Sequence, residues 1–217
     1  MRRALVWGSE GFVGFNLVSH LKKLGVEAER YDIYLGHDIC DEELLRESMI
    51  GVDVAYNCAA IANISECDRD REKCRRVNYE GTNSFVKVAL ETRVKPILLS
   101  TDIIWGDSYY GALKKLMEAE HQEHAVILRL TNLIGGFRYE DKRNVLWHFL
   151  RDNPIRVHAK ATTVDLVPIE QALEEMVKAE NYSPGIYNVD SGLKIPVRLL
   201  AFIFGAARGV PVEVVEN

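Results

Sequence analysis

Short apolar runs alternate with amphipathic segments along the first 130 residues of the chain. Residues 4–7 are apolar and stop at Gly8, and residues 12–24 then carry leucines at spacings of four and three. This order predicts a strand, a tight turn and a helix. The alternation continues, with strands expected at 26–32, 52–57, 96–100 and 125–130 and helices at 41–49, 70–93 and 109–124. We therefore predict an α/β fold with a doubly wound parallel sheet and helices on both faces.

The pattern is less regular after Gly135. Helices are expected there at 144–151, 169–180 and 197–207, and strands at 155–158 and 185–189. The 217 residues exceed a typical domain of ~150 residues but are too few for two full domains. We therefore expect a core over residues 1–135 and a small lobe over residues 136–217. The lobe is expected to interleave with the end of the sheet, so that both parts form one structural domain.

Charge, hydropathy and cysteine content limit the partners and the cellular compartment that are expected for this chain. The chain has 27 basic and 32 acidic side chains, a net charge of −5, which disfavours nucleic acid or an anionic membrane as its main partner. The longest apolar stretch, residues 199–207, is far shorter than the ~20 residues of a membrane span. Four cysteines without a Cys-x-x-Cys pair predict a reduced protein in the cytoplasm.

Three glycines, Gly8, Gly11 and Gly14, stand between the first predicted strand and the first predicted helix. A chain that binds a pyrophosphate there must turn sharply, bring backbone N–H groups close to the ligand and pack helix on strand, and each requirement excludes a side chain. Asp32 follows at the end of the second strand, where a carboxylate binds both ribose hydroxyls and repels a 2′-phosphate. The pattern predicts a Rossmann fold that binds NAD, while neighbouring Arg30 leaves NADP open.

A second group of residues suits proton transfer. Tyr110 and Lys114 stand at i and i+4 of a predicted helix and therefore share one face. An ammonium beside a phenol favours the phenolate, which suits a general acid or base. Thr101 and Asp102 follow the preceding strand, at the edge where doubly wound sheets hold their ligands. A hydroxyl from this segment can bind a reacting carbonyl.

These motifs resemble the extended short-chain dehydrogenase/reductase family, the NAD-dependent epimerases, dehydratases and reductases of nucleotide sugars. The glycine-rich turn matches the family's Gly-x-x-Gly-x-x-Gly, and Tyr110 and Lys114 match its catalytic Tyr-x-x-x-Lys. By the same resemblance, Thr101 takes the position of the catalytic Ser/Thr. Within the family, residues 100–106 are most similar to the segments found in dTDP-4-dehydrorhamnose reductases and in dTDP-glucose 4,6-dehydratases, and the resemblance to the reductases is slightly better.

The resemblance also implies which residues contact the ligands. By this resemblance, Asp102 and Asn132 take positions at which the family binds its substrate. No metal site is expected, since His121 and His124 are interpreted as part of a solvated face together with the glutamates around them. The residues expected to bind the cofactor are Gly8, Gly11, Phe12, Val13, Gly14, Asp32, Asp38, Ile39, Cys58, Ala59, Ala60, Asn78, Tyr110 and Lys114.

The implied activity is hydride exchange with a carbonyl or alcohol of a sugar, most like that of a 4-keto-sugar reductase acting on a nucleotide sugar. Ile103 stands where the dehydratases have a glutamate that supports proton abstraction, which argues against dehydration. Two alternatives stay open. One is a nucleotide-sugar epimerase, and the other is a non-catalytic NAD-binding or redox-sensing module, since the interval between Thr101 and Tyr110 is short for the family.

A homodimer is expected from the two long predicted helices, 70–93 and 109–124. Connection handedness places both helices on one face of the sheet. Their apolar residues are expected to exceed what one sheet can cover, so that a leftover stripe is buried in a two-fold helix bundle, as the family resemblance also implies. These apolar residues are Phe85, Val86, Leu90, Leu113, Leu116 and Met117.

Overall fold

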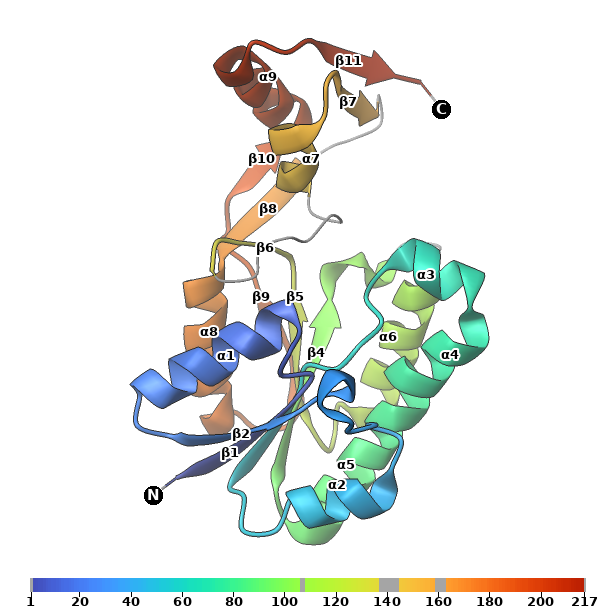
Figure 1. The fold of residues 1–217 in the computed structure, drawn as a ribbon, viewed down its shortest axis with the longest axis vertical. Helices are drawn as coiled ribbons and strands as arrows, with labels where there is room; N and C mark the ends of the chain where they lie inside the picture. The colour runs from blue at the N-terminus through green and yellow to red at the C-terminus, as the bar shows by residue number, and fades with distance from the viewer. Residues whose placement is uncertain (1, 106–107, 137–144, 159–162, 217) are drawn as a thin grey trace.

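A six-stranded sheet forms the centre of the computed structural model, which describes residues 2–105, 108–136, 145–158 and 163–216. The strand order is β2-β1-β3-β4-β5-β9, and every neighbouring pair is parallel (Figure 1). The predicted doubly wound α/β fold is confirmed. The strands are β1 (Arg3–Trp7), β2 (Glu27–Tyr31), β3 (Val54–Asn57), β4 (Lys95–Thr101), β5 (Val126–Leu130) and β9 (Gly185–Val189).

Helices cover both faces of this sheet. One face carries α1 (Phe12–Lys23) and α8 (Ile169–Lys178), and the other carries α2 (Glu42–Ser48), α5 (Gly81–Thr92) and α6 (Tyr109–His121). Successive strand residues point to opposite faces. In β4, Ile97 therefore joins the apolar cluster beneath α1 and α8, and Leu98 joins the cluster beneath α5. Burial on both faces explains why the inner strands β1 and β4 contain unbroken apolar runs, whereas the edge strand β2 is mostly polar.

The helix predicted at 70–93 is one continuous path with an irregular middle. It consists of α4 (Arg71–Arg75), a π-helical turn η2 (Arg76–Glu80) and α5. A short helix that was not predicted, α3 (Ile64–Arg69), precedes it. The Asn63 side chain caps α3 by accepting from Glu66 N at 3.0 Å, and Asp70 caps α4 by accepting from Lys73 N at 3.1 Å.

The expectation that all cysteines are reduced is wrong. Cys67 on α3 and Cys74 on α4 form a disulfide, which is buried in a cluster with Tyr110 and Leu113. The helix break at Asp70 turns α4 back toward α3, and the sequence gives no periodic signal for that turn. Cys40 and Cys58 are free thiols, and burial raises their pKa values to about 11 and about 12.

A smaller lobe lies beyond the carboxyl ends of β4 and β5 (Figure 1). Its core contains Phe149, Ile155, Val157, Val164, Leu200 and Ala201. Its order of pairing is β10-β8-β6 in one sheet and β11-β7 in another. The elements are β6 (Asn132–Ile134), α7 (Val145–Arg151), β7 (Ile155–His158), β8 (Thr163–Pro168), β10 (Lys194–Pro196), α9 (Val197–Arg208) and β11 (Val212–Val215).

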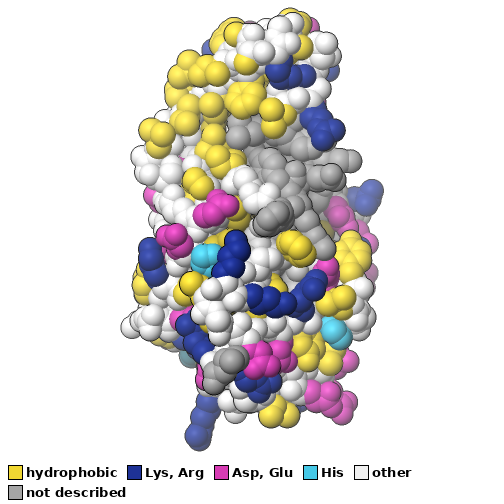
Figure 2. All heavy atoms as spheres, turned by 60° about the vertical axis from the view of Figure 1, so that its left-hand side comes forward, with side chains coloured by type: hydrophobic (Ala, Val, Ile, Leu, Met, Phe, Trp, Pro, Cys, Tyr) yellow, Lys and Arg dark blue, Asp and Glu magenta, His cyan; other side chains and the backbone are white. Residues whose placement is uncertain are grey.

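The chain passes between core and lobe more than once. It enters the lobe after β5, returns to the core as α8, the short η4 (Ala179–Asn181) and β9, and enters the lobe again at β10. The expected division at residue 135 stays a prediction. Leu199, Phe202 and Ile203 on α9 are each more than half exposed, and Figure 2 shows hydrophobic side chains gathered at this end of the molecule. Among the described residues, no helix is long and apolar enough to cross a membrane.

Candidate active site

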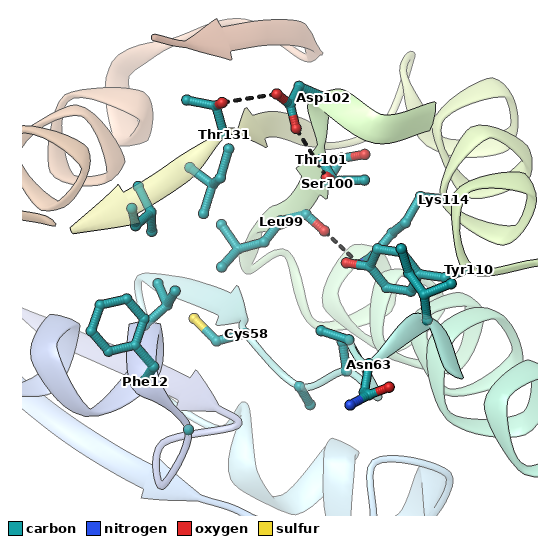
Figure 3. Close-up of a pocket in the computed structure, with 18 of the residues that line it drawn as sticks. Phe12, Cys58, Asn63, Leu99, Ser100, Thr101, Asp102, Tyr110, Lys114 and Thr131 are labelled. Atoms are coloured by element: carbon teal, nitrogen blue, oxygen red, sulfur yellow. Dashed lines mark hydrogen bonds between the residues drawn. The ribbon is translucent and has the colours of Figure 1, made fainter. Parts of the chain in front are cut away.

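A pocket of about 650 Å³ lies where the glycine-rich turn meets the carboxyl ends of the strands (Figure 3). Four segments that are distant in sequence line it: the start of α1, the loop after β3, the end of β4 with the start of α6, and the β5–β6 junction. Eleven of the predicted site residues lie in this lining: Gly11, Phe12, Val13, Cys58, Ala59, Ala60, Thr101, Asp102, Tyr110, Lys114 and Asn132.

The glycine-rich turn has no room for side chains. Gly8 has a φ of +79°, and a Cβ built on it would lie 2.4 Å from Ala59 N. A Cβ on Gly14 would lie 2.1 Å from the Gly8 carbonyl oxygen. Gly11 is the N-cap of α1 and lines the pocket together with Phe12 and Val13, so the start of this helix, where backbone N–H groups have no partner within the helix, borders the pocket. This cradle fits a pyrophosphate at a helix N-terminus.

One further polar atom of this turn is buried. Among the residues that the structure describes, Ser9 Oγ is buried and has no hydrogen-bond partner. Buried hydroxyls are normally paired, because an unpaired polar group away from water costs about 1–3 kcal/mol. Ser9 was not among the predicted residues, although it stands directly after Gly8.

Asp32 is 6% exposed and is fixed by two backbone N–H groups. Its Oδ2 accepts from Glu10 N at 2.9 Å, and its Oδ1 accepts from Tyr34 N at 3.0 Å in the short helix η1 (Ile33–Leu35). The bond to Glu10 holds the carboxylate against the glycine-rich turn. This is the place where the ribose of a dinucleotide would meet it.

Asp38, Ile39 and Asn78 lie outside the lining of the pocket. Asp38 is paired with Arg76 at 2.5 Å and accepts from Cys40 N at 2.9 Å. Burial raises the pKa of Asp38, but these partners outweigh it and the pKa is lowered. Asn78 is fully buried and holds the loop after β3, since its side chain accepts from Ile61 N at 2.7 Å and donates to Ile61 O at 2.8 Å.

Thr101, Tyr110 and Lys114 face the same pocket, as Figure 3 shows. Ser108 begins α6 by accepting from Gly111 N at 3.0 Å, which places Tyr110 and Lys114 on the first turns. Lys114 Nζ lies 6.0 Å from the centre of the Tyr110 ring and donates to Leu99 O at 2.6 Å. Burial lowers the pKa of Lys114 to about 8.

A buried ion pair between Glu118 and Arg129 lies next to Lys114 on α6. Glu118, one turn after Lys114 on α6, accepts from Ser100 Oγ at 2.6 Å and from Arg129 at 2.9 and 2.7 Å. Glu118 is 3% exposed, so the interpretation of this stretch as a solvated face is wrong for Glu118 and also for His121, which is 7% exposed. The ion pair ties α6 to the ends of β4 and β5. In the sequence, Glu118 stands four residues after Lys114, just as Lys114 stands four residues after Tyr110, and this spacing is the signal that places it on the same helix face.

The predicted substrate residues lie on the side of the pocket nearest the lobe. Asp102, in the short helix η3 (Asp102–Trp105), accepts from Thr131 Oγ1 at 2.8 Å. Asn132 donates to the same Thr131 hydroxyl at 3.4 Å. Thr101 Oγ1 lies 3.4 Å from Asp102 Oδ1. Thr131, which sequence analysis did not predict, therefore connects both predicted residues.

Lys114→Met is expected to stabilise the protein by about 1–2 kcal/mol near pH 7. Holding the pKa of Lys114 at about 8 instead of 10.5 costs stability, at ~1.4 kcal/mol per unit, and the lost hydrogen bond to Leu99 O offsets part of the gain. This loss of stability is complete below pH 8, where Lys114 is charged in both states. It vanishes above pH 10.5, where Lys114 is neutral in both the folded and the unfolded protein.

Urea unfolding near pH 7 and near pH 10 measures this gain. It should shrink at the higher pH, and a gain that is equal at both would contradict the assigned cause. Lys115→Met is the matched control because Lys115 is exposed on the same helix.

The sequence of this chain is similar to a known protein family and to several curated proteins. Residues 4–153 match the model of the family described as NAD dependent epimerase/dehydratase. The mouse sterol-4-alpha-carboxylate 3-dehydrogenase, decarboxylating, is 26% identical over 46% of this chain and 30% of the mouse enzyme. The dTDP-4-dehydrorhamnose reductase of Mycolicibacterium smegmatis is 30% identical over 32% of this chain and 21% of that enzyme. The chain thus spans less than a third of the length of these two curated relatives.

Solved structures resemble the fold over nearly the whole chain. The UDP-glucose 4-epimerase of Thermus thermophilus in complex with NAD has a TM-score of 0.81 and 21% identity, and the match covers 99% of this chain and 86% of that chain. The dTDP-4-dehydrorhamnose reductase of Bacillus anthracis in complex with NADP has a TM-score of 0.81 and 18% identity, and it covers 100% and 85%. At these identities the likeness shows the fold.

Proposed function

Because the chain belongs to the NAD-dependent epimerase/dehydratase family, we propose that it is an oxidoreductase that exchanges a hydride with a carbonyl or alcohol of a nucleotide sugar, most like a 4-keto-sugar reductase. The observation that carries this proposal is the meeting of Thr101, Tyr110 and Lys114 in one pocket with the glycine-rich turn. A binding module needs the turn but has no need of a proton donor beside a buried ammonium.

The residues present fit a dinucleotide. Gly8, Gly11 and Gly14 would hold the pyrophosphate, Asp32 the adenosine ribose, and the loop at 58–60 together with Lys114 the nicotinamide end. The bound nicotinamide would supply or accept the hydride. The loop at 58–60 also lies against Gly8, so that the parts of the chain expected at the nicotinamide and at the pyrophosphate are packed together.

Each catalytic side chain has a distinct task. The Tyr110 hydroxyl gives a proton to the sugar oxygen during reduction and takes it back in the reverse direction. Lys114 favours the phenolate electrostatically, and its ammonium has three donors, so it can keep Leu99 O and still bind a ribose hydroxyl. The Thr101 hydroxyl orients the reacting oxygen. Asp102 and Asn132 would contact the sugar from the side of the lobe.

A panel of dTDP- and UDP-linked 4-keto-sugars tests this function. With NADH present, we expect loss of the reduced-nicotinamide absorbance with at least one member of the panel. An epimerase would invert a sugar hydroxyl without net consumption of NADH, an outcome supported by the likeness to the Thermus epimerase. Tight NADH binding without change in any sugar would contradict the proposal and favour a non-catalytic module.

NADH is expected to bind more tightly than NADPH. The Asp32 carboxylate is fixed by Glu10 N and Tyr34 N, so it cannot turn away from a 2′-phosphate. Close negative charges repel in this partly buried setting. Fluorescence titration of both reduced cofactors measures the ratio, and tighter binding of NADPH would contradict the role of Asp32.

A homodimer through α5 and α6 is part of the proposal, but the exposed apolar surface there is smaller than expected. Of the six apolar residues that were expected to exceed what the sheet covers, Phe85, Val86, Leu113 and Met117 are buried in the protomer's own core. Leu90 and Leu116 are about half exposed and stay available for a two-fold contact. The family resemblance also supports the dimer.

Sedimentation at micromolar concentration should give about twice the chain mass of 24.6 kDa. Leu116→Arg should shift the mass toward the monomer, because a charge would be buried in the contact. A wild-type monomer under the same conditions would contradict the proposed dimer.

A further inference from the structure

Two charged side chains lie beside Asp32 and belong to one arrangement. Glu10 stands in the glycine-rich turn, and its side chain forms an ion pair with Arg30 on β2. The backbone N–H of the same Glu10 donates to Asp32 Oδ2 at 2.9 Å. The Glu10 side chain is 14% exposed and that of Arg30 is 37% exposed. Glu10 therefore connects the carboxylate of Asp32 with the guanidinium of Arg30.

The strand geometry places Arg30 near the expected ribose. Arg30 and Asp32 are two residues apart, and Asp32 continues the extended backbone of β2 with φ −161° and ψ 152°. Side chains at this spacing point to the same face of a strand. Because β2 is the edge strand of the sheet, Arg30 lies at the margin of the site, where a group added to the ribose would meet it.

The charges at this margin would act on a phosphate at the ribose. A guanidinium is the side chain best suited to a phosphate, since it offers a planar fork of donors. Here Glu10 Oε1 pairs with one nitrogen of that fork, Arg30 Nη2, so the site contains a second carboxylate on the residue whose backbone binds Asp32. A 2′-phosphate would meet two negative charges and an arginine that already has a carboxylate partner.

We propose that Glu10 is a specificity-determining residue, which makes the site select NAD over NADP by holding Arg30 in an ion pair and by adding negative charge beside Asp32. This inference rests on the proposed function, because it takes the glycine-rich turn as the dinucleotide site. It goes further in naming Glu10 as the residue that withholds Arg30 from a 2′-phosphate.

Glu10→Gln is the variant that tests this role. It keeps the size of the side chain and the backbone bond to Asp32 but removes the charge that holds Arg30. The dissociation constant for NADPH should fall about tenfold, which corresponds to ~1.4 kcal/mol, while that for NADH should stay within about threefold. Both constants are measured by fluorescence titration, which needs no substrate and no turnover.

A second variant separates the two parts of the proposal. In Glu10→Gln/Arg30→Gln, the gain in NADPH affinity should be lost, because no guanidinium is left to bind the phosphate. Glu27→Gln is the matched control. It removes one carboxylate from the same strand, where Glu27 lies 3.9 Å from Arg3 and points to the other face. The ratio of NADH to NADPH affinity should not change in this control.

The outcomes are distinguishable. An unchanged ratio in Glu10→Gln, or a gain that survives in the double variant, would overturn the proposed role of Glu10 while the wild type still bound NADH. If the wild type bound neither cofactor, the proposed function would fail and this inference with it. Thermal unfolding of each variant shows whether it is folded, and Glu10→Ala provides a second removal of the charge.

Discussion

Replacing Tyr110 with Phe is expected to lower turnover by about 10²- to 10⁴-fold, the usual contribution of a general acid or base. The substitution removes the hydroxyl that is proposed to exchange a proton with the sugar oxygen, and it keeps the ring in place. The ring packs against the Cys67–Cys74 disulfide and Leu113, and those contacts remain. The dissociation constant for NADH should therefore stay within a few-fold, and both quantities can be measured on the same preparation.

Tyr109→Phe is the matched control for this experiment. Tyr109 is the neighbouring residue on α6, but its ring lies 5.1 Å from the Arg71 guanidinium and is absent from the pocket lining. Turnover should be almost unchanged in Tyr109→Phe. Near-normal turnover in Tyr110→Phe would remove Tyr110 from the mechanism.

Gly14→Ala is expected to weaken NADH binding by about 100-fold or more. Its new Cβ would lie 2.1 Å from the Gly8 carbonyl oxygen and 3.0 Å from Ser9 Cα, and both contacts are with backbone. Neither contact can be relieved by turning a side chain, so the turn itself must move. Since the turn is proposed to present the N–H groups of α1 to the pyrophosphate, the movement would destroy the cradle. Fluorescence titration with NADH measures the loss.

Gly25→Ala provides the comparison for Gly14→Ala. Gly25 has a φ of +75° but no atom within 4 Å of a built Cβ. The substitution should cost about 1–2 kcal/mol of stability through its left-handed backbone and leave NADH affinity unchanged. If folded Gly14→Ala bound NADH as tightly as the wild type, the glycine-rich turn would not be the pyrophosphate site.

The core of the fold was predictable because its signals are local. In β4, both Ile97 and Leu98 are buried, each on a different face, so the strand forms an unbroken apolar run. In α1, Leu17 and Leu21 lie one turn apart and are both fully buried. The glycines of the turn stand between these two kinds of element, which made the order of strand, turn and helix recognisable.

The lobe was less predictable because its strands are short and pair across long intervals of sequence. β10 has three residues, and its Ile195 lies opposite Val164 of β8. Neither segment is long enough to establish a periodic pattern. Helix α3 was missed for a related reason, since it depends on the Asn63 cap and on packing of Cys67 rather than on a repeated apolar stripe.

The proposed catalytic residues Tyr110 and Lys114 were predicted from their spacing of four residues, which is a property of one helix. The residues that sequence analysis missed act through partners in other segments. Glu118 depends on Arg129 and Ser100, Thr131 on Asp102, and Glu10 on Arg30. A charged residue looks the same in sequence whether it is solvated or paired, so only the fold distinguishes these cases.

Isotope transfer from the cofactor to a sugar tests most directly whether this pocket exchanges a hydride. Wild-type protein is incubated with NADH deuterated at its transferable position and with the 4-keto-sugar panel, and the products are analysed by mass spectrometry. A sugar alcohol that carries the deuterium is expected, and this product should be lost in Tyr110→Phe. Bound NADH with no deuterium in any sugar would contradict the assignment of this pocket to hydride exchange with a keto-sugar.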